Sequence, residues 1–344
     1  MNGSPYVVSA NNSVRITMFK VLAALLPGIL THAWFFGAGI LVSLIVCTVI
    51  ALALESLALA MRGHPLKPFL GDGSVIVTAW LFALSVPTLA PIWLYATGLL
   101  FAVIIAKHLY GGLGQNPFNP AMVGYAVLIV SFPVYMTQWA APSLLAVHTP
   151  NLGEAFDLVF TGGGLISADA YTLATPLDTL KTLSLAGQSV GDIFSQPIFG
   201  LLGGKDGEWV AMAYALGGLL LLGNRVMTWH VPVAFLLSVA LSAELVRMFD
   251  PGQHGGALFH LFSGGVMLGA FFIATDPVSG CGTPLGKLIF AGLAGFLTVM
   301  IRSYGGYPDG VAFSVLLMNV AAPFIDAYTQ PRVFGHARGE RRRP

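Results

Sequence analysis

Hydroxyl and carboxyl side chains recur at a regular spacing in residues 167–181, SADAYTLATPLDTLK. Asp169, Thr172 and Thr175 stand three residues apart, and Pro176 follows directly. Proline restricts the preceding residue to extended or turn backbone, which presents the Thr175 hydroxyl where a modifying enzyme can reach it. A hydroxyl beside a carboxylate is also common in ordinary capped turns, so the spacing alone leaves a purely structural turn as the alternative.

Two interruptions rich in Gly and Pro form a second group of polar positions, YGGLGQNPFNPAMVG at 110–124 and YGGYPDGVAF at 304–313. Such breaks free backbone amides and carbonyls, which must then meet protein, water, an ion or a cofactor. The candidate residues at or near the breaks are Gly111, Gly112, Asn116, Asn119, Asp276 and Asp309. A carboxylate at the bilayer centre costs about 2.5–3.5 kcal/mol, so a deep aspartate needs a function, whereas one at the membrane surface can simply cap a helix.

The composition indicates what kind of protein positions these groups. Only 9% of the 344 residues are charged and the mean hydropathy is +0.79, whereas a soluble domain carries about 25% charged residues. The chain is therefore expected to be an all-α polytopic membrane protein that contacts the lipid bilayer. A net charge of +1 gives no signature of nucleic-acid binding. Two isolated cysteines cannot hold an iron–sulfur cluster or zinc by themselves, and no metal site or catalytic motif is predicted.

Ten apolar segments can cross the hydrocarbon core, which takes roughly 20 helical residues each. They lie at 20–36, 38–60, 74–89, 91–108, 119–134, 208–223, 230–248, 258–275, 285–301 and 309–327. Residues 135–207 form the one long polar connection. With both chain ends in the cytoplasm, twelve Lys and Arg residues fall on the cytoplasmic side and four on the other. This distribution predicts cytoplasmic termini (1–19 and 328–344) and an outward, periplasmic loop over 135–207.

The chain also repeats itself with a shift of 189 to 194 residues. GSVIVTAWLFALSVP (73–87) is echoed by GGVMLGAFFIATDP (264–277), and FAVIIAKHLYGG (101–112) is echoed by GFLTVMIRSYGG (295–306). Each repeat, 20–134 and 208–327, holds five spans, and an odd number of spans inserts the second repeat upside down. Inverted repeats with broken helices are typical of transporters, whose sites lie between the repeats. Chance similarity between apolar segments is the alternative.

Four longer motifs give the chain a specific resemblance. LYGGLGQNPFNPAMVGY, ATPLDTLK, MLGAFFIATDPVS and IRSYGGYPDGVAFSVLLMN resemble the RnfD/NqrB family of membrane subunits of electron-transport complexes. The resemblance covers nearly the whole chain, and the short segment before the first span is more like RnfD than NqrB, which has a longer N-terminal extension. It implies an electron-carrying subunit in the bacterial inner membrane. The Rnf-type complex couples electron transfer between ferredoxin and NAD to Na⁺ or H⁺ translocation.

The resemblance also implies a cofactor. In this family a flavin transferase attaches FMN through a phosphoester to the last Thr of an S/T-G-A-T signature preceded by Asp. In this sequence the match makes Thr175 the implied attachment point. Asp169 and Thr172 are the implied recognition residues for the transferase, and Ala174 belongs to the implied cofactor-binding signature. Leu173 replaces the usual Gly, and Ala170 departs from the signature as well. By analogy with NqrB, a second, noncovalent flavin such as riboflavin is expected in the membrane part.

The implied partners are the other proteins of the Rnf complex: the A and E membrane subunits, the G flavoprotein and the B and C iron–sulfur subunits. They must handle ferredoxin and NAD, because this chain has neither iron–sulfur ligands nor a dinucleotide motif. Two other functions stay open. The five-plus-five repeat is similar to urea-transporter architecture, which would make the chain a redox-silent channel or transporter. A quinone-reducing, NqrB-like subunit is the second alternative.

Overall fold

The computed structural model describes residues 14–162 and 170–330, so Asp169 lies outside the described residues. The described chain is largely α-helical, as the composition predicted. The first half contains α1 (Val14–Phe36), α2 (Gly39–Met61), α3 (Leu66–Leu70), α4 (Ser74–Ala83), α5 (Ile92–Leu99), the π-helix η2 (Leu100–His108), α6 (Pro120–Ser131) and α7 (Pro133–Met136). The second half contains α11 (Gly207–Gly223), α12 (His230–Phe249), α13 (Ala257–Phe262), α14 (Val266–Leu268), the π-helix η4 (Gly269–Ile273), α15 (Pro284–Tyr304) and α16 (Val311–Thr329).

Five of these helices, α1, α2, α12, α15 and α16, are long and apolar enough to cross a membrane. Shorter apolar helices occupy four more of the predicted segments: α4, α5 with η2, α6, and α11. The broken run α13–α14–η4 takes the remaining one. The prediction of a polytopic all-α membrane protein is therefore confirmed.

The third segment of each half is interrupted, where continuous spans were predicted. The helix expected over 74–89 ends at Ala83, because Pro87 and Pro91 follow and cannot continue it. The helix expected over 258–275 breaks between α13 and α14, where Gly264 has a φ of +65°. A left-handed residue cannot continue a right-handed helix, and glycine accepts this backbone at the lowest cost.

The two halves pack their helices in the same pairs and meet along two matching seams. In the second half α15 packs against both α12 and α16, and in the first half α5 and η2 pack against both α2 and α6. Between the halves, α1 packs against α11 and α6 packs against α16. The first seam is close, since a Cβ on Gly217 would overlap the Ala24 carbonyl oxygen. Small residues at helix contacts are the usual route to such proximity in membranes.

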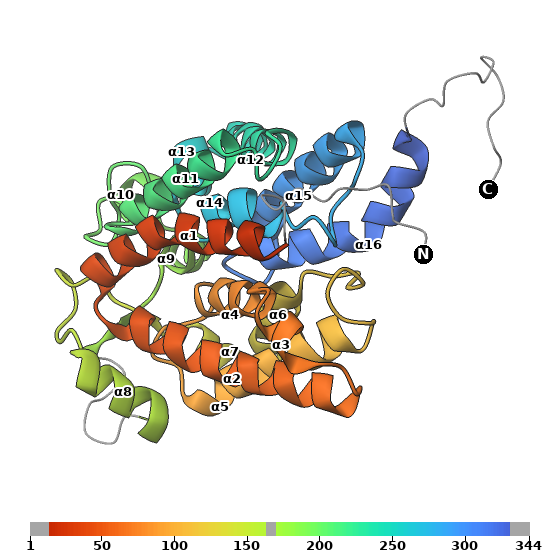
Figure 1. The fold of residues 1–344 in the computed structure, drawn as a ribbon. Coiled ribbons are helices and arrows are strands. Elements are labelled where there is room, and N and C mark those ends of the chain that lie inside the picture. Colours follow the sequence, from red (N-terminus) through yellow and green to blue (C-terminus); the bar gives the residue numbers. More distant parts are fainter. Residues whose placement is uncertain (1–13, 163–169, 331–344) are drawn as a thin grey trace, which may run out of the picture.

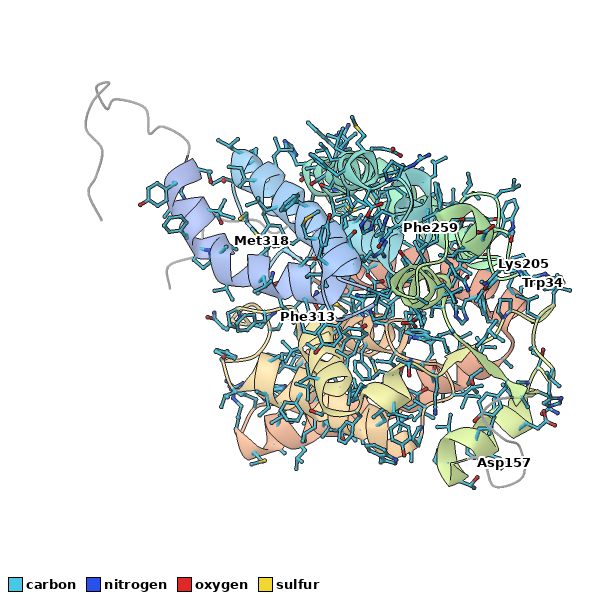
Figure 2. All side chains as sticks on the ribbon, turned by 180° about the vertical axis from the view of Figure 1, so that it is seen from behind. Trp34, Asp157, Lys205, Phe259, Phe313 and Met318 are labelled. Atoms are coloured by element: carbon cyan, nitrogen blue, oxygen red, sulfur yellow. The ribbon has the colours of Figure 1, made fainter. Side chains whose placement is uncertain are left out.

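The connecting segment between the halves is structured rather than a plain loop. It contains β1 (Trp139–Ala140), α8 (Leu152–Thr161), β2 (Thr172–Leu173), α9 (Pro176–Leu185) and α10 (Val190–Phe194). The two strands pair antiparallel. Helices α8, α9 and α10 gather at one end of the helical body, on the left in Figure 1, and Lys205 and Trp34 lie at the same end in Figure 2. A small apolar cluster that includes Leu177, Leu180 and Phe259 fixes α9 to the second half.

Candidate cofactor and ion-binding cavities

Thr175 is the N-cap residue of α9, and its backbone is extended as the following proline predicted, with φ −71° and ψ 158°. Its Oγ1 accepts a hydrogen bond from the Asp178 backbone N–H at 3.1 Å. The same hydroxyl donates to Asp178 Oδ2, also at 3.1 Å. Thr at the N-cap followed by Pro at the first helical position is a favoured way to start a helix, so Thr-Pro-Leu-Asp specifies this geometry locally.

Thr175 opens on a cavity of about 250 Å³, here called the loop cavity, which lies between the connecting segment and both halves. The predicted residues Ala174, Thr175 and Asp309 all line it. The rest of the lining is largely aromatic and apolar and includes Phe36, Met122, Tyr125, Trp139, Tyr214 and Phe262. Thr172 does not line this cavity but pairs with Ala140 in the two-stranded sheet. The structure thus places the candidate hydroxyl at the wall of a mainly apolar cavity.

Two polar groups of the loop cavity have no hydrogen-bond partner among the described residues. They are His32 Nδ1 and Ser263 Oγ, both buried. Buried polar groups are nearly always paired in folded proteins, so an unpaired one calls for an explanation such as a bound molecule. A flat heterocycle with ring nitrogens and carbonyl oxygens would offer hydrogen-bond partners to both of these atoms.

Asp309 lies at the wall of the loop cavity in a tight network with Arg302. Arg302 donates to Asp309 Oδ1 from Nε at 3.2 Å and from Nη2 at 3.1 Å. The guanidinium also donates to the carbonyl oxygens of His260 and Ser263, at 2.7 and 2.9 Å. Asp309 Oδ2 in turn accepts from the Gly265 N–H at 2.8 Å. The network therefore closes the break between α13 and α14, and Asp309 is a paired carboxylate.

Lys181 fixes α9 to the second Gly-Pro break. Its Nζ donates to the carbonyl oxygens of Gly305 and of Tyr307, the latter at 2.9 Å. Burial lowers the pKa of Lys181, and the nearby Asp178 carboxylate opposes that shift. Burial likewise raises the pKa of Asp178, against the opposing effects of the Thr175 hydroxyl and the Lys181 charge. The helix that carries Thr175 is thus held in place by polar contacts that are partly withdrawn from water.

A second cavity of about 290 Å³, here called the distal cavity, lies between the halves. It brings together three predicted residues, Asn116, Asn119 and Asp276, and its other charged lining residues are Lys107, Arg225 and Lys287. Asp276 accepts from Ser279 Oγ at 2.7 Å and from the Val278 N–H at 3.2 Å. Gly111 and Gly112 line neither cavity. They form a left-handed turn, with φ of +127° and +99°, and Arg62 donates to the Gly111 carbonyl at 3.0 Å.

Residues 191 positions apart in the sequence line the two cavities in corresponding places. Ser74, Pro120 and Ala121 line the distal cavity, and the residues 191 later, Gly265, Val311 and Ala312, line the loop cavity. The reverse case also occurs: Phe36 of the first half lines the loop cavity, and Met227, the residue 191 positions later, lines the distal cavity. This is the shift at which the sequence repeats, so each half supplies the same part of its fold to one cavity or the other.

Two buried asparagines meet where the halves pack together, and only one of them, Asn119, was predicted from the sequence. The backbone N–H of Asn119 donates to Asn319 Oδ1 at 3.0 Å, and its side-chain amide donates to the Ile273 carbonyl at 3.3 Å. Asn319 Nδ2 donates to the Ser279 carbonyl at 3.0 Å. Both asparagines are 3% exposed. Asn319 is a lone amide in the apolar run VLLMNVAAP, and that isolation was the signal that could have found it.

A buried ionic cluster beside the distal cavity was not predicted either. Lys107 Nζ lies 2.8 Å from Glu55 Oε1 and donates to Ser74 Oγ at 3.2 Å. His108 Nε2 lies 2.9 Å from Glu55 Oε2, and its Nδ1 lies 3.2 Å from Arg62 Nη1. Glu55 and Lys107 are each only 2% exposed. Ionisable residues within an apolar span are rare and normally paired. Lys107 and His108, at the end of the fourth predicted segment, could therefore have indicated such a cluster.

Comparison with known proteins gives a consistent result. A family model described as the NQR2, RnfD, RnfE family matches residues 1–335. A relative from Escherichia fergusonii, named as the D subunit of an ion-translocating oxidoreductase complex, is 50% identical over 98% of both chains. Relatives with the same name from Escherichia coli O1:K1 / APEC and from Shigella boydii serotype 18 are 49% identical, again over 98% of both chains.

Proposed function

The chain belongs to the NQR2, RnfD, RnfE family, and we propose that it is the flavin-carrying membrane subunit of an ion-translocating oxidoreductase complex. In this proposal FMN is joined to Thr175 through a phosphoester. One observation carries it. The Thr175 hydroxyl stands at the wall of a mainly apolar cavity of about 250 Å³ with several aromatic residues, and at the N-terminus of a helix, where a phosphate is favoured.

The residues present fit such a group. The N-terminus of α9 and Lys205, another residue of the loop cavity, supply positive potential for the phosphodiester. The aromatic lining suits a flat ring system, and the unpaired His32 Nδ1 and Ser263 Oγ suit its polar edge. The bound flavin would supply one- and two-electron redox chemistry, and the protein supplies position, electrostatics and exclusion of water.

The distal cavity is the proposed place for the second, noncovalent flavin such as riboflavin, or for the ion path. Asn116 and Asn119 offer amide groups there, and Asp276 offers a carboxylate. Asp276 is bonded only to neutral groups among the described residues, whereas Asp309 is already paired with Arg302. We therefore expect Asp276→Asn to reduce the number of ions moved per electron more than Asp309→Asn. Equal ratios in the two variants and the wild type, in proteoliposomes, would exclude both residues from ion transport.

The proposal includes a place and a set of partners. It puts the chain in the bacterial inner membrane with both ends cytoplasmic and the connecting segment periplasmic. It makes the subunit dependent on a flavin transferase for FMN. Ferredoxin and NAD are left to the other proteins of the complex, the A and E membrane subunits, the G flavoprotein and the B and C iron–sulfur subunits. Sodium ions or protons are the transported ions.

The proposal is tested by flavin fluorescence of this subunit in a denaturing gel after co-expression with a flavin transferase. The wild-type band is expected to fluoresce and the Thr175→Ala band to be dark. Ser189→Ala is the matched control, because Ser189 caps α10 in the same way within the same segment. A dark wild-type band, with the transferase active on another acceptor, would contradict the flavoprotein assignment. Fluorescence that survives in Thr175→Ala would mean that the flavin is attached to a residue other than Thr175.

A further inference from the structure

The Thr175 hydroxyl is in contact with a carboxylate of its own helix, and we propose that this carboxylate, Asp178, is the general base for attachment of the flavin phosphate to Thr175. The acceptor protein would thus supply a catalytic residue for its own modification. This inference rests on the proposed function, since it concerns how Thr175 becomes modified. It gives Asp178 a role that a helix cap alone does not require.

The geometry orients the hydroxyl for attack. The Asp178 backbone N–H donates to Thr175 Oγ1, and the hydroxyl proton points to Asp178 Oδ2, both at 3.1 Å. A hydroxyl oxygen has two lone pairs, of which the backbone N–H engages one. The second lone pair stays free for an incoming phosphorus, while the proton already lies on the path to the carboxylate. A general base must be within about 2.6–3.2 Å of the proton-bearing atom, and Asp178 meets this condition.

The surroundings make Asp178 a better base than an exposed aspartate. Burial raises its pKa, and the Thr175 hydroxyl and the Lys181 charge only partly oppose the shift. Lys181 lies on the same helix and is itself engaged with the carbonyls of Gly305 and Tyr307. The other charged groups near Thr175 are Lys205 and Asp309, which line the loop cavity, and Arg302, which is paired with Asp309. Proton transfer is most efficient when the pKa of the base lies close to the working pH.

The step balances with a flavin dinucleotide as the phosphoryl donor. The Thr175 oxygen attacks the flavin-side phosphorus of the pyrophosphate, so an Oγ–P bond forms and the bridging P–O bond breaks. The adenylate leaves, the hydroxyl proton passes to Asp178 Oδ2, and nothing is oxidised or reduced. The protonated carboxyl can then donate a hydrogen bond to the new phosphoester. Without that proton, two negative groups would face each other at the start of α9.

The chain offers a matched control one helix further on. Ser189 caps α10, donates to Asp192 Oδ2 at 2.6 Å and accepts from the Asp192 N–H at 3.2 Å. This is the same arrangement of hydroxyl, carboxylate and backbone. It is exposed, however, and Ser189 lines neither cavity. The pair Ser189–Asp192 therefore has the same helix-cap geometry as Thr175–Asp178 without the loop cavity beside it.

The test measures the rate of flavin attachment to the detergent-solubilised full chain, using purified transferase and flavin adenine dinucleotide. Asp178→Asn keeps a hydrogen-bond acceptor for the hydroxyl but cannot take its proton, so we expect attachment to slow on the order of 100-fold. Asp178→Glu should recover part of the rate, and Asp192→Asn should leave it unchanged. Thermal unfolding of each variant shows whether the fold is kept.

The dependence on pH separates a base from a cap. The wild-type rate should fall as the pH drops through the raised pKa of Asp178, relative to the rate on an unfolded peptide of residues 167–181, which reports the transferase's own titration. Asp178→Asn should lack this fall. A wild-type rate for folded Asp178→Asn, or a wild-type profile parallel to that of the peptide, would overturn the inference and leave FMN at Thr175 intact. A wild-type chain that takes up no flavin would overturn the proposed function and this inference together.

Discussion

The loop cavity and the distal cavity are built from corresponding parts of the two halves, yet they differ in what covers them. The loop cavity is lined in part by residues of the connecting segment, which bring a hydroxyl, a helix N-terminus and the Trp139 ring. The distal cavity has no such cover among the described residues, and two lysines, an arginine and an aspartate line it. Both cavities also have a buried cation nearby, Arg302 in one case and Lys107 in the other.

The difference shows how one framework can serve two purposes. Helices α6 and α16 begin at the same relative place, and the residues 191 apart keep the same positions at the two walls. The asymmetry therefore comes mainly from residues 137–206, which have no counterpart in either half. The segment between the two similar halves thus gives the loop cavity the proposed attachment point, whereas, within the described part of the chain, the distal cavity is lined by residues of the two halves alone.

The largest effect that tests this comparison should come from the two buried cations. Arg302→Met leaves Asp309 and two carbonyls without their donor, and removing one member of a buried pair costs about 3–5 kcal/mol. We expect Arg302→Met to lower the melting temperature sharply and to slow flavin attachment, because the wall at Gly264 and Gly265 shifts. Lys107→Met should also destabilise the protein but leave attachment at the wild-type rate. If both variants slow attachment equally, the two cavities do not behave independently.

The seam of α1 and α11 borders both cavities, so crowding it should disturb both. A Cβ on Gly217 would overlap the Ala24 carbonyl oxygen, and backbone cannot move aside as a side chain can. Overpacking costs about 1–3 kcal/mol, and we expect Gly217→Ala to reach the upper end of that range and to lower the melting temperature of the solubilised protein accordingly. Gly292→Ala is the control, since nothing lies within 4 Å of its Cβ position. Equal melting temperatures of the two variants would contradict the close approach of α1 and α11 at Gly217.

The smallest expected effect concerns the asparagine link between the halves. Asn319→Leu removes the acceptor of the Asn119 N–H and the donor to the Ser279 carbonyl, and a buried group left unpaired costs about 1–3 kcal/mol. We expect a modest loss of stability, together with loss of any noncovalent flavin, while the covalent flavin stays. High-performance liquid chromatography of extracted flavin measures the noncovalent flavin, and fluorescence of the band in a denaturing gel measures the covalent flavin. Loss of the covalent flavin as well would mean that this link supports the whole interface.

The sequence allowed most of the fold to be predicted, because the bilayer restricts the solutions. Long apolar runs gave α1, α2, α12, α15 and α16, since a spanning segment must be helical to satisfy its backbone. The interruptions at Ala83 and at Gly264 were not predicted, because hydropathy does not distinguish a broken helix from a continuous one. The signals were present as Pro87, Pro91 and a Gly-Gly pair, whose effect on the backbone is local.

The candidate site was predictable only where chemistry is encoded locally. Thr175 and its extended backbone follow from the next residue, and its cap follows from Asp178 three positions on. Contacts between distant segments could not be read in this way. The pairing of Asp309 with Arg302 was not predicted, and neither was that of Asn119 with Asn319, since both depend on how the broken helices meet. The contact of Arg62 with the turn at Gly111 and Gly112 could not be predicted either, and the suggested place of these glycines on an ion or flavin pathway stays a prediction.

The position of Thr175 at a helix cap has a consequence for the order of events in the cell. Its hydroxyl and the Asp178 carboxylate come together only after the first turn of α9 has closed. A chain whose connecting segment is still unfolded would therefore be a poor acceptor, and attachment would follow folding. The covalent flavin would then serve as a maturation mark, and the fluorescent fraction of a preparation would count the molecules that completed assembly of this region.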